Sequence, residues 1–243
     1  MLSGFDCNKP YCSIPDNVKQ FPWLRNPFCE QNNAVFDKPW QKGFYCWDQT
    51  PWLDRLTPYL SYGFAGAAAE IGHCGELCYE IEFTGRGHAH PDDPGSMLLL
   101  GKRMVVQVND IASDGVGGHF SLAIPGGGVD GAERCSYQWG AQQRKVEVGV
   151  MPGGFLAQCQ DCDEFGKNCR PRRQAHEETQ RCVRERCIRA FEDPTFADLR
   201  AACEWYSSFL MVADTPEMRY RKVKCPKELD NRLWRRGIEG LHG

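Results

Sequence analysis

The sequence predicts a mainly β, disulfide-rich protein of an oxidising compartment, with helical segments inserted in its C-terminal third. Fourteen cysteines run from Cys7 to Cys225, and an even number of this size suits a disulfide framework. Several segments alternate apolar and polar residues, as half-buried strands do. A Cys-rich stretch at about 155–190 has a helical composition instead. We expect one domain over 1–243, because helices inserted between strands explain this change better than a second domain would.

The strand predictions differ in strength along the chain. Lys102–Asp110 (KRMVVQVND) is the clearest strand, and Cys78–Thr84 (CYEIEFT) alternates apolar and polar residues. His119–Val129 follows the clearest strand across a Gly-rich connection, and Met218–Pro226 returns the chain to a strand near its end. Tyr62–Glu70 is small and Ala-rich, so we expect a short buried helix or a tightly packed turn there.

Two helices are predicted in the C-terminal third. Pro171–Ala190 is rich in charges and in good helix formers, and Val183, Cys187 and Ala190 fall on one side of it. Asp198–Val212 is predicted to be a second amphipathic helix.

Composition excludes some classes of function. The net charge of −3 gives no basis for binding a polyanion such as nucleic acid. No apolar run approaches the length needed to span a bilayer, and Met97–Leu100, for example, is four residues long, so we expect no membrane association. The first residues have neither the basic nor the apolar region of a signal peptide, so secretion implies that the signal has been removed. We expect an extracellular monomer.

Zinc is the competing explanation for the cysteines. Cys159 and Cys162 form a CxxC, with Cys169, Cys182 and Cys187 beyond it. No second CxxC and no HxxxH follows at zinc-finger spacing, so disulfides are the preferred interpretation. A polar loop at 85–96 contains two histidines and two aspartates and is interpreted as a solvated insertion. The glycine run at 126–128 lacks the Lys-Ser/Thr of a phosphate loop, so no cofactor is predicted.

Ordered blocks along almost the whole chain resemble glycoside hydrolase family 45. The blocks are Phe5–Cys12, Cys46–Trp52, Tyr62–Ala65, Cys78–Tyr79, Met104–Gln107, His119–Val129, Cys203–Trp205 and Val223–Leu229. The run HFSLAIPGGGV is the most distinctive of them, and insertions at about 86–97 and 155–190 separate others. The resemblance implies a six-stranded double-psi β-barrel with an open groove, a fold that expansins share.

The resemblance also implies an inverting endoglucanase chemistry with two carboxyl groups. Such enzymes use one carboxylate to deprotonate water and a second, protonated one to protonate the leaving sugar oxygen. Asp6 falls on the position of the base. Ser121 stands where the family has its acid, and a serine hydroxyl cannot donate a proton near neutral pH. Asp114 matches an accessory aspartate, and His119 matches a residue beside the acid.

The sugar platform near the cleavage point also departs from the family. Phe5 replaces a tryptophan and Ile14 replaces a second one, so stacking surface has been lost at these two substrate-binding positions. Gly126 and Gly127 of the glycine run are also assigned to substrate binding. The expected ligand is a β-1,4-glucan chain or a cello-oligosaccharide.

Three functions therefore stand open on the sequence. The preferred one is a hydrolytically disabled glucan-binding or wall-loosening protein. The second is an inverting endo-β-1,4-glucanase that uses a surrogate acid such as Asp114, or an enzyme in which serine was introduced at position 121. Asp110, Asp130 and Glu133 are further surrogate candidates near the motif. The third is a secreted interaction protein that uses the helical insertion.

The resemblance also implies disulfide pairings. Carried over from the family, they are Cys7–Cys135, Cys12–Cys74, Cys46–Cys225 and Cys78–Cys203. The remaining cysteines, at positions 29, 159, 162, 169, 182 and 187, are expected to pair among themselves around the insertion.

Overall fold

The computed structural model describes residues 2–5, 50–67, 77–111, 119–128, 139–149, 151–162 and 172–229. The strands are β1 (Leu2–Phe5), β2 (Trp52–Leu53), β3 (Leu60–Ala67), β4 (Cys78–Gly87), β5 (Arg103–Ile111), β6 (Phe120–Ala123) and β7 (Pro216–Val223). The helices are α1 (Pro94–Met97), α3 (Ala141–Arg144), α4 (Gly154–Cys159), α5 (Arg172–Ala190), α6 (Ala197–Ser208) and the 3-10 turn η4 (Pro194–Phe196).

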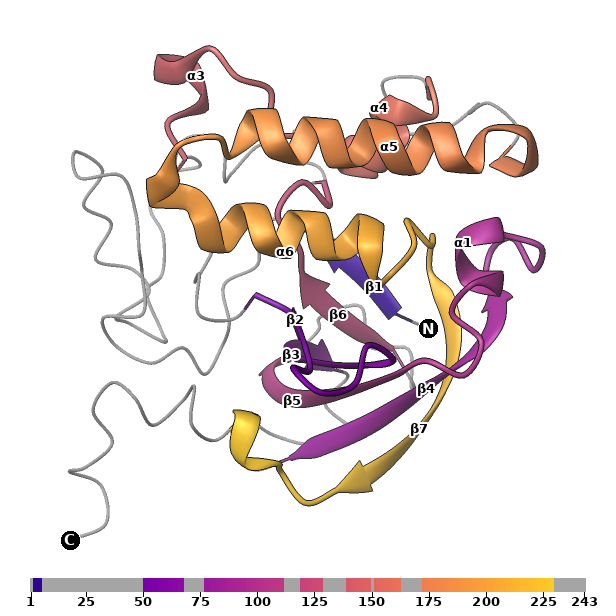
Figure 1. Cartoon of the computed structure of the whole chain (residues 1–243). Coiled ribbons are helices and arrows are strands. Elements are labelled where there is room, and N and C mark those ends of the chain that lie inside the picture. The colour runs from indigo at the N-terminus through magenta and orange to yellow at the C-terminus, as the bar shows by residue number, and fades with distance from the viewer. Residues whose placement is uncertain are drawn as a thin grey trace, which may run out of the picture.

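The strands form one mixed sheet in the order β1-β6-β3-β5-β4-β7, with β2 paired to β3. β1 is parallel to β6 and β3 is parallel to β5, whereas the other pairs are antiparallel. The sheet curls strongly (Figure 1): the rings of Phe120 on β6 and Tyr220 on β7 lie 5.3 Å apart although their strands are not neighbours. Among the described pairs the sheet stays open between β1 and β7.

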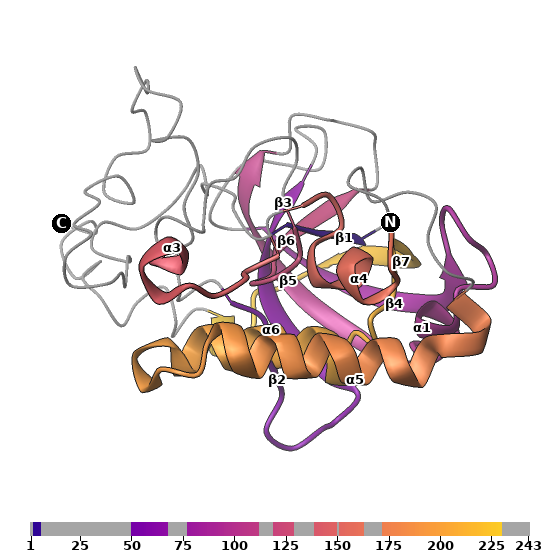
Figure 2. The same cartoon turned by 90° about the horizontal axis from the view of Figure 1, so that it is seen from above.

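The mainly β, disulfide-rich fold with helical insertions is confirmed. α5 and α6 both lie on one side of the sheet, with α6 next to the strands and α5 packed on the far side of α6, as Figures 1 and 2 show from two directions. Their buried faces join the inward-facing strand residues in the main core, which includes Ile81, Val106, Phe120, Val183 and Leu199. None of the helices in the described ranges is long and apolar enough to cross a membrane.

Two predicted helices are confirmed with small shifts of their ends. α5 begins at Arg172 and ends at Ala190, and its predicted inner positions Val183, Cys187 and Ala190 are fully buried. α6 ends at Ser208, earlier than predicted. There the Lys102 ammonium donates a 2.7 Å hydrogen bond to the Phe209 carbonyl oxygen, one of the acceptors that a helix C-terminus leaves unsatisfied.

The helix or turn predicted for Tyr62–Glu70 is wrong, because residues 60–67 form β3. β3 is hydrogen-bonded on both sides, to β5 and to β6, and seven of its eight residues are buried. Small residues such as Ala65 and Gly66 let neighbouring strands and the core approach closely, so tertiary burial overrides the helix propensity of alanine. The loop predicted at 85–96 likewise contains the end of β4 and the start of α1.

The disulfides correct two of the pairings carried over from the family. Cys78 is bonded to Cys225 rather than to Cys203, because β4 and β7 pair with Cys78 opposite Val223. Cys203 is bonded to Cys187, which joins α6 to α5, so Cys46–Cys225 and Cys78–Cys203 are both wrong. The expectation that Cys187 pairs within the insertion is therefore wrong as well.

Cys159–Cys182 joins α4 to α5 as the insertion hypothesis expected. No cysteine in the described part of the chain is a free thiol, so those at 159, 182 and 187 are not available as zinc ligands. The pairings Cys7–Cys135 and Cys12–Cys74 lie outside the described residues.

Candidate functional site

Ser121 lies in the middle of the short strand β6, between β1 and β3. It is paired in register with Ser3 on β1 and with Gly66 on β3, and it is only 6% exposed. Neither neighbour has a carboxyl group. The position that the resemblance gives to the acid is therefore buried, and its register positions on the two neighbouring strands are occupied by a serine and a glycine.

The parallel pairing of β1 with β6 bears on the expected base. Phe5, the last residue of β1, is opposite Ala123, two residues beyond Ser121. Asp6 follows Phe5 in the sequence but lies outside the described residues, as do Asp114 and Ile14. The strand that leads into Asp6 is thus paired directly with the strand that holds Ser121, and the two are the first strands in the sheet order.

His119 is described and lies immediately before β6. It is 6% exposed, so it is a buried histidine two residues from Ser121. Phe120, between them, points to the main core, where its ring meets those of Tyr79 and Tyr220 at centroid distances of 5.6 and 5.3 Å. Burial, and next the nearby phenol of Tyr220, raise the pKa of Tyr79, so this hydroxyl stays protonated at neutral pH.

The glycine run after β6 is held by close packing against α4. Gly126 has a φ of +79°, and a Cβ there would lie 2.4 Å from the Phe155 ring. The Phe155 amide donates a 2.9 Å hydrogen bond to the Gly126 carbonyl oxygen. Gly127 is half-buried and its amide donates to the Ile124 carbonyl, closing the turn. Gly126 thus has a structural reason to be glycine, and the assignment of Gly126 and Gly127 to sugar contacts stays a prediction.

The helical insertion supports this turn from behind. Phe155, which blocks any side chain at Gly126, belongs to α4 and is 1% exposed. The Cys203 sulfur lies 3.2 Å from the position a Gly126 Cβ would take, and its disulfide to Cys187 ties α6 to α5. The insertion therefore fixes the turn that follows the Ser121 strand.

Sequence reasoning named Asp110 only as one of several acidic residues near the motif. The strand register gives it a definite place, because Asp110 on β5 is opposite Gly66, and Gly66 is opposite Ser121. Strands are spaced by about 4.8 Å, so the backbones of Asp110 and Ser121 are roughly 10 Å apart in one row with a glycine between them. A register shift between Ala65 and Gly66 brings Asp110, rather than the residue before it, opposite Gly66, and no pattern in the sequence predicts this shift.

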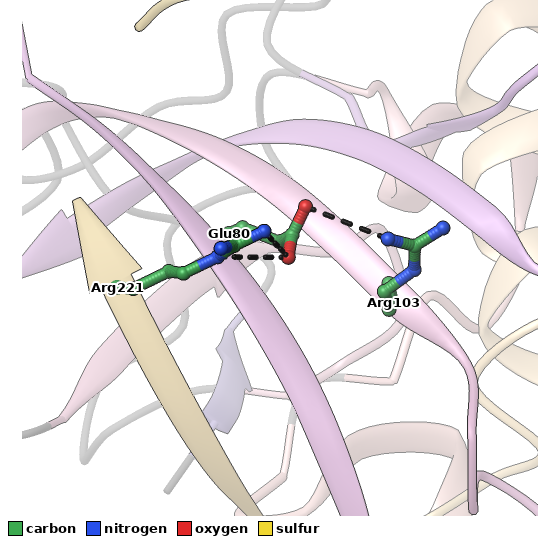
Figure 3. Close-up of polar contacts among 3 residues, drawn as sticks. All are labelled: Glu80, Arg103 and Arg221. Atoms are coloured by element: carbon green, nitrogen blue, oxygen red, sulfur yellow. Dashed lines mark hydrogen bonds and ion pairs between the residues drawn. The ribbon is translucent and has the colours of Figure 1, made fainter. Parts of the chain in front are cut away.

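A second polar group that sequence reasoning missed lies on the outward face of β4, β5 and β7. Glu80 accepts hydrogen bonds from Nε and Nη2 of Arg221, at 3.1 and 2.8 Å. Its other oxygen is 3.7 Å from an Arg103 nitrogen, so one carboxylate is held between two guanidinium groups (Figure 3). The alternation of charged and apolar residues in the segments EIE and RYR indicates that each has a charged face, but only the strand register shows that these faces meet.

No group of three potential metal ligands occurs within the described ranges. The described part of the site consists of hydroxyl, imidazole and backbone groups on and beside β6, on a rigid sheet with a disulfide-tied helical support.

Comparisons with known proteins agree with this picture. The sequence profile described as Glycosyl hydrolase family 45 matches residues 30–179. The chain is 36% identical to Endoglucanase B of Cellvibrio japonicus over 94% of this chain and 43% of that protein. It is 30% identical to an endoglucanase of the springtail Cryptopygus antarcticus, covering 91% of this chain and 81% of that protein. The crystal structure of cellulase from Cryptopygus antarcticus superposes with a TM-score of 0.53 at 26% identity, covering 95% of this chain and 93% of that one.

The chain belongs to glycosyl hydrolase family 45. It spans less than half the length of the Cellvibrio relative, and more than four fifths of the springtail relative.

Proposed function

We propose that this protein is a secreted, monomeric β-1,4-glucan-binding protein of the family 45 fold, one domain over 1–243, that does not hydrolyse its ligand by the inverting mechanism. The observation that carries the proposal is Ser121. It occupies the position that the resemblance gives to the acid, it is buried, and its register partners Ser3 and Gly66 supply no carboxyl group in its place.

The missing proton donor decides the chemistry. A departing sugar alkoxide is a poor leaving group, and a positioned general acid contributes about 10²–10⁴-fold to such a step. Serine cannot supply that proton near neutral pH. The base Asp6 could still activate a water, but an activated water attacking a glycoside whose leaving oxygen stays unprotonated gives little cleavage.

The remaining site residues would bind and orient the sugar chain. Asp114 and His119 are proposed to border the cleavage point, with Phe5 and Ile14 as the weakened stacking platform. Gly126 and Gly127 are proposed to offer backbone groups to the ligand. Supporting this, the β6 strand and its turn are held rigidly by α4, as a preorganised binding surface requires.

The test is a Ser121→Asp substitution. We expect the protein with Ser121 to bind insoluble cellulose in a pull-down and to release no measurable reducing sugar from soluble β-glucan. Ser121→Asp should release reducing sugar, because the substitution returns a carboxyl group to a scaffold that still places it. Ser121→Asn is the matched control, since it has the shape of aspartate without a transferable proton. Strong hydrolysis by the Ser121 protein would refute the proposal.

A second candidate function is an active endo-β-1,4-glucanase with a surrogate acid. The alignment of Asp110, Gly66 and Ser121 in one row of the sheet favours it, because the register places an acidic residue two strands from Ser121 with a glycine at the position between them. Two relatives carrying the name endoglucanase, at 36% and 30% identity, also favour it. If the Ser121 protein does cleave β-glucan, Asp110→Asn and Asp114→Asn decide which carboxyl group acts. Of these two substitutions, only the one that replaces the surrogate acid should abolish cleavage.

A further inference from the structure

The end of β7 and the residues after it form an unusually basic segment. Residues 219–228 contain five basic residues and one acidic residue, although the whole chain has a net charge of −3. The basic residues are Arg219, Arg221, Lys222, Lys224 and Lys227. All five cations are exposed. We call these five residues the basic strand. β7 is the last strand of the sheet order, at the outer edge beside β4 (Figure 1).

Local acidic residues balance only part of this charge. Arg221 is bonded to Glu80 on β4, which also faces Arg103 on the neighbouring strand β5 (Figure 3). The side chain of Arg221 is still 73% exposed in that contact. Within the described part of the chain, no ion pair involves Arg219, Lys222, Lys224 or Lys227.

This arrangement is unfavourable for the isolated protein. Alternate residues of a strand are about 6.8 Å apart, which is less than the Debye length of about 8 Å at physiological ionic strength. Arg219 and Arg221 therefore repel each other on one side of β7, with Glu80 and Glu82 opposite them on β4. Lys222 adds a further positive charge on the other side of the strand, and Lys224 follows just beyond its end. A ligand with regularly spaced negative charges would relieve this repulsion along the whole strand.

We propose that the basic strand is a second binding site, separate from the Ser121 site, for a polysaccharide that carries uronic acid carboxylates. Arg–carboxylate pairing of the required kind already occurs on this face in the Arg221–Glu80 contact. Lysines at alternate positions then add point charges along an extended ligand.

The exposed ring of Tyr220 favours a sugar polymer over another polyanion. Tyr220 is 43% exposed, and its ring is fixed edge-on against Tyr79 and Phe120 at 5.9 and 5.3 Å. By strand alternation this ring lies on the core-facing side of β7 with its register partner Ile81, whereas Arg219 and Arg221 lie on the other side. The exposed part of the ring offers an apolar surface on which a pyranose ring can stack where a sugar chain runs along β7. The choice of a glycan also rests on the proposed function, because a glucan-binding protein meets its ligand among other polysaccharides.

The simpler explanation is protection of an exposed strand edge. Lysine and arginine on edge strands prevent pairing with other chains, and β7 is the edge strand beside β4 among the described strands. The two explanations differ in what happens when the charge is removed. Loss of edge protection causes self-association, whereas loss of a binding site weakens binding of an anionic glycan.

The experiment compares the natural protein with Arg219→Ser/Lys222→Ser/Lys224→Ser. The matched control is Arg181→Ser/Arg184→Ser/Arg189→Ser, which removes three exposed cations from α5 with the same change in net charge. Binding is measured by affinity electrophoresis and calorimetry to polygalacturonate and to neutral hydroxyethyl cellulose. Carboxymethyl cellulose, which has the same glucan backbone with carboxylates added, completes the set.

We expect the β7 variant to bind polygalacturonate roughly tenfold more weakly at low salt, as three exposed ion pairs of ordinary strength would give. The difference should shrink at about 0.5 M salt, because screening weakens exposed charges. The α5 control should bind like the natural protein. Tyr220→Ala should weaken polygalacturonate binding at both salt concentrations, because stacking is not screened.

Three results would overturn the proposal. One is equal binding of polygalacturonate by the β7 variant and the α5 control. The second is equally tight binding of polyglutamate or single-stranded DNA, which would make the surface a general polyanion site. The third is self-association of the β7 variant with unchanged glycan binding, which assigns the charge to edge protection. Hydroxyethyl cellulose separates this question from the proposed function, since failure to bind it refutes the glucan site alone.

Discussion

The glycine turn after β6 gives a sharp test of how the helical insertion supports the site. Gly126 and Gly101 have nearly the same backbone conformation, with φ of +79° and +81°. A Cβ at Gly101 would meet nothing within 4 Å, whereas one at Gly126 would lie 2.4 and 2.6 Å from two atoms of the Phe155 ring. Substituting alanine at each position therefore separates backbone strain from steric conflict.

The expected costs follow from these contacts. The left-handed conformation costs an alanine about 1–2 kcal/mol, and the reduced freedom of the unfolded chain returns about 0.4–1 kcal/mol. Gly101→Ala should therefore lower the free energy of unfolding by about 1 kcal/mol. Gly126→Ala carries the same strain and adds about 1–3 kcal/mol for overpacking against a ring that is 1% exposed. Its total should be about 2–4 kcal/mol.

Urea unfolding followed by tryptophan fluorescence, with disulfides intact, measures both costs. Combining Gly126→Ala with Phe155→Leu should cost at least about 1 kcal/mol less than the sum of the single changes, because the smaller side chain makes room for the new methyl group. Equal costs for Gly101→Ala and Gly126→Ala would refute the idea that α4 is packed tightly against the turn. Additivity with Phe155→Leu would refute it as well.

Three further predictions concern stability. Replacing Cys78 and Cys225 by serine should cost roughly 5 kcal/mol and replacing Cys159 and Cys182 roughly 3.4 kcal/mol, because the closed loops span 147 and 23 residues; equal losses in chemical denaturation would contradict this. Trp205→Phe should cost about 1–3 kcal/mol through the lost 2.8 Å hydrogen bond to Ser61, and Ser61→Ala should abolish that difference in a double-mutant cycle. Burial lowers the pKa of His176, although the carboxylates of Asp93 and Glu177 act in the opposite direction, so the unfolded chain takes up a proton more readily than the folded one. The free energy of unfolding should therefore fall as the pH is lowered from 7 to 5. His176→Gln should reduce this pH dependence, measured by denaturation at several pH values, and an equal pH dependence in both proteins would show that burial does not dominate.

Local patterns predicted the elements whose burial is one-sided. β4 and α5 were predicted because their apolar residues recur at the period of the element, and the residues expected on the inner side of α5 are buried. β5 was predicted although its residues 104–108 are buried on both faces, and its valines favour a strand. β3 was missed because it is buried on both faces, where alternation disappears and small residues suggest a helix. A central strand of this kind is identified by its neighbours rather than by its own sequence.

The disulfide pairings failed for a related reason. Carrying them over from the family assumed that the insertion adds cysteines that bond only to one another. Instead α5 packs on α6, which brings Cys187 beside Cys203, and the pairing of β4 with β7 brings Cys78 beside Cys225. Cross-strand and interhelical proximity depends on register and packing, which local sequence does not encode. The Glu80–Arg221 contact escaped prediction in the same way.

The burial of position 121 leads to a last prediction, on stability rather than activity. Ser121 is 6% exposed, so an aspartate there would be largely removed from water, and burial disfavours the charged form of a carboxyl group. The pKa of the new carboxyl group should rise above its value in the unfolded chain, which is what a general acid requires. The folded Ser121→Asp protein then binds more protons than the unfolded one between these two pKa values, so its stability should increase as the pH falls through the folded pKa and be lowest at neutral and alkaline pH. Serine avoids that cost at every pH.

We therefore expect Ser121→Asp to be less stable than the natural protein at pH 7, with the difference shrinking toward pH 4, whereas Ser121→Asn should show a difference that does not change with pH. Denaturant unfolding of the three proteins at matched pH values measures this, and a Ser121→Asp protein whose deficit is the same at pH 4 and pH 7 would show that the site is open enough to solvate the carboxylate.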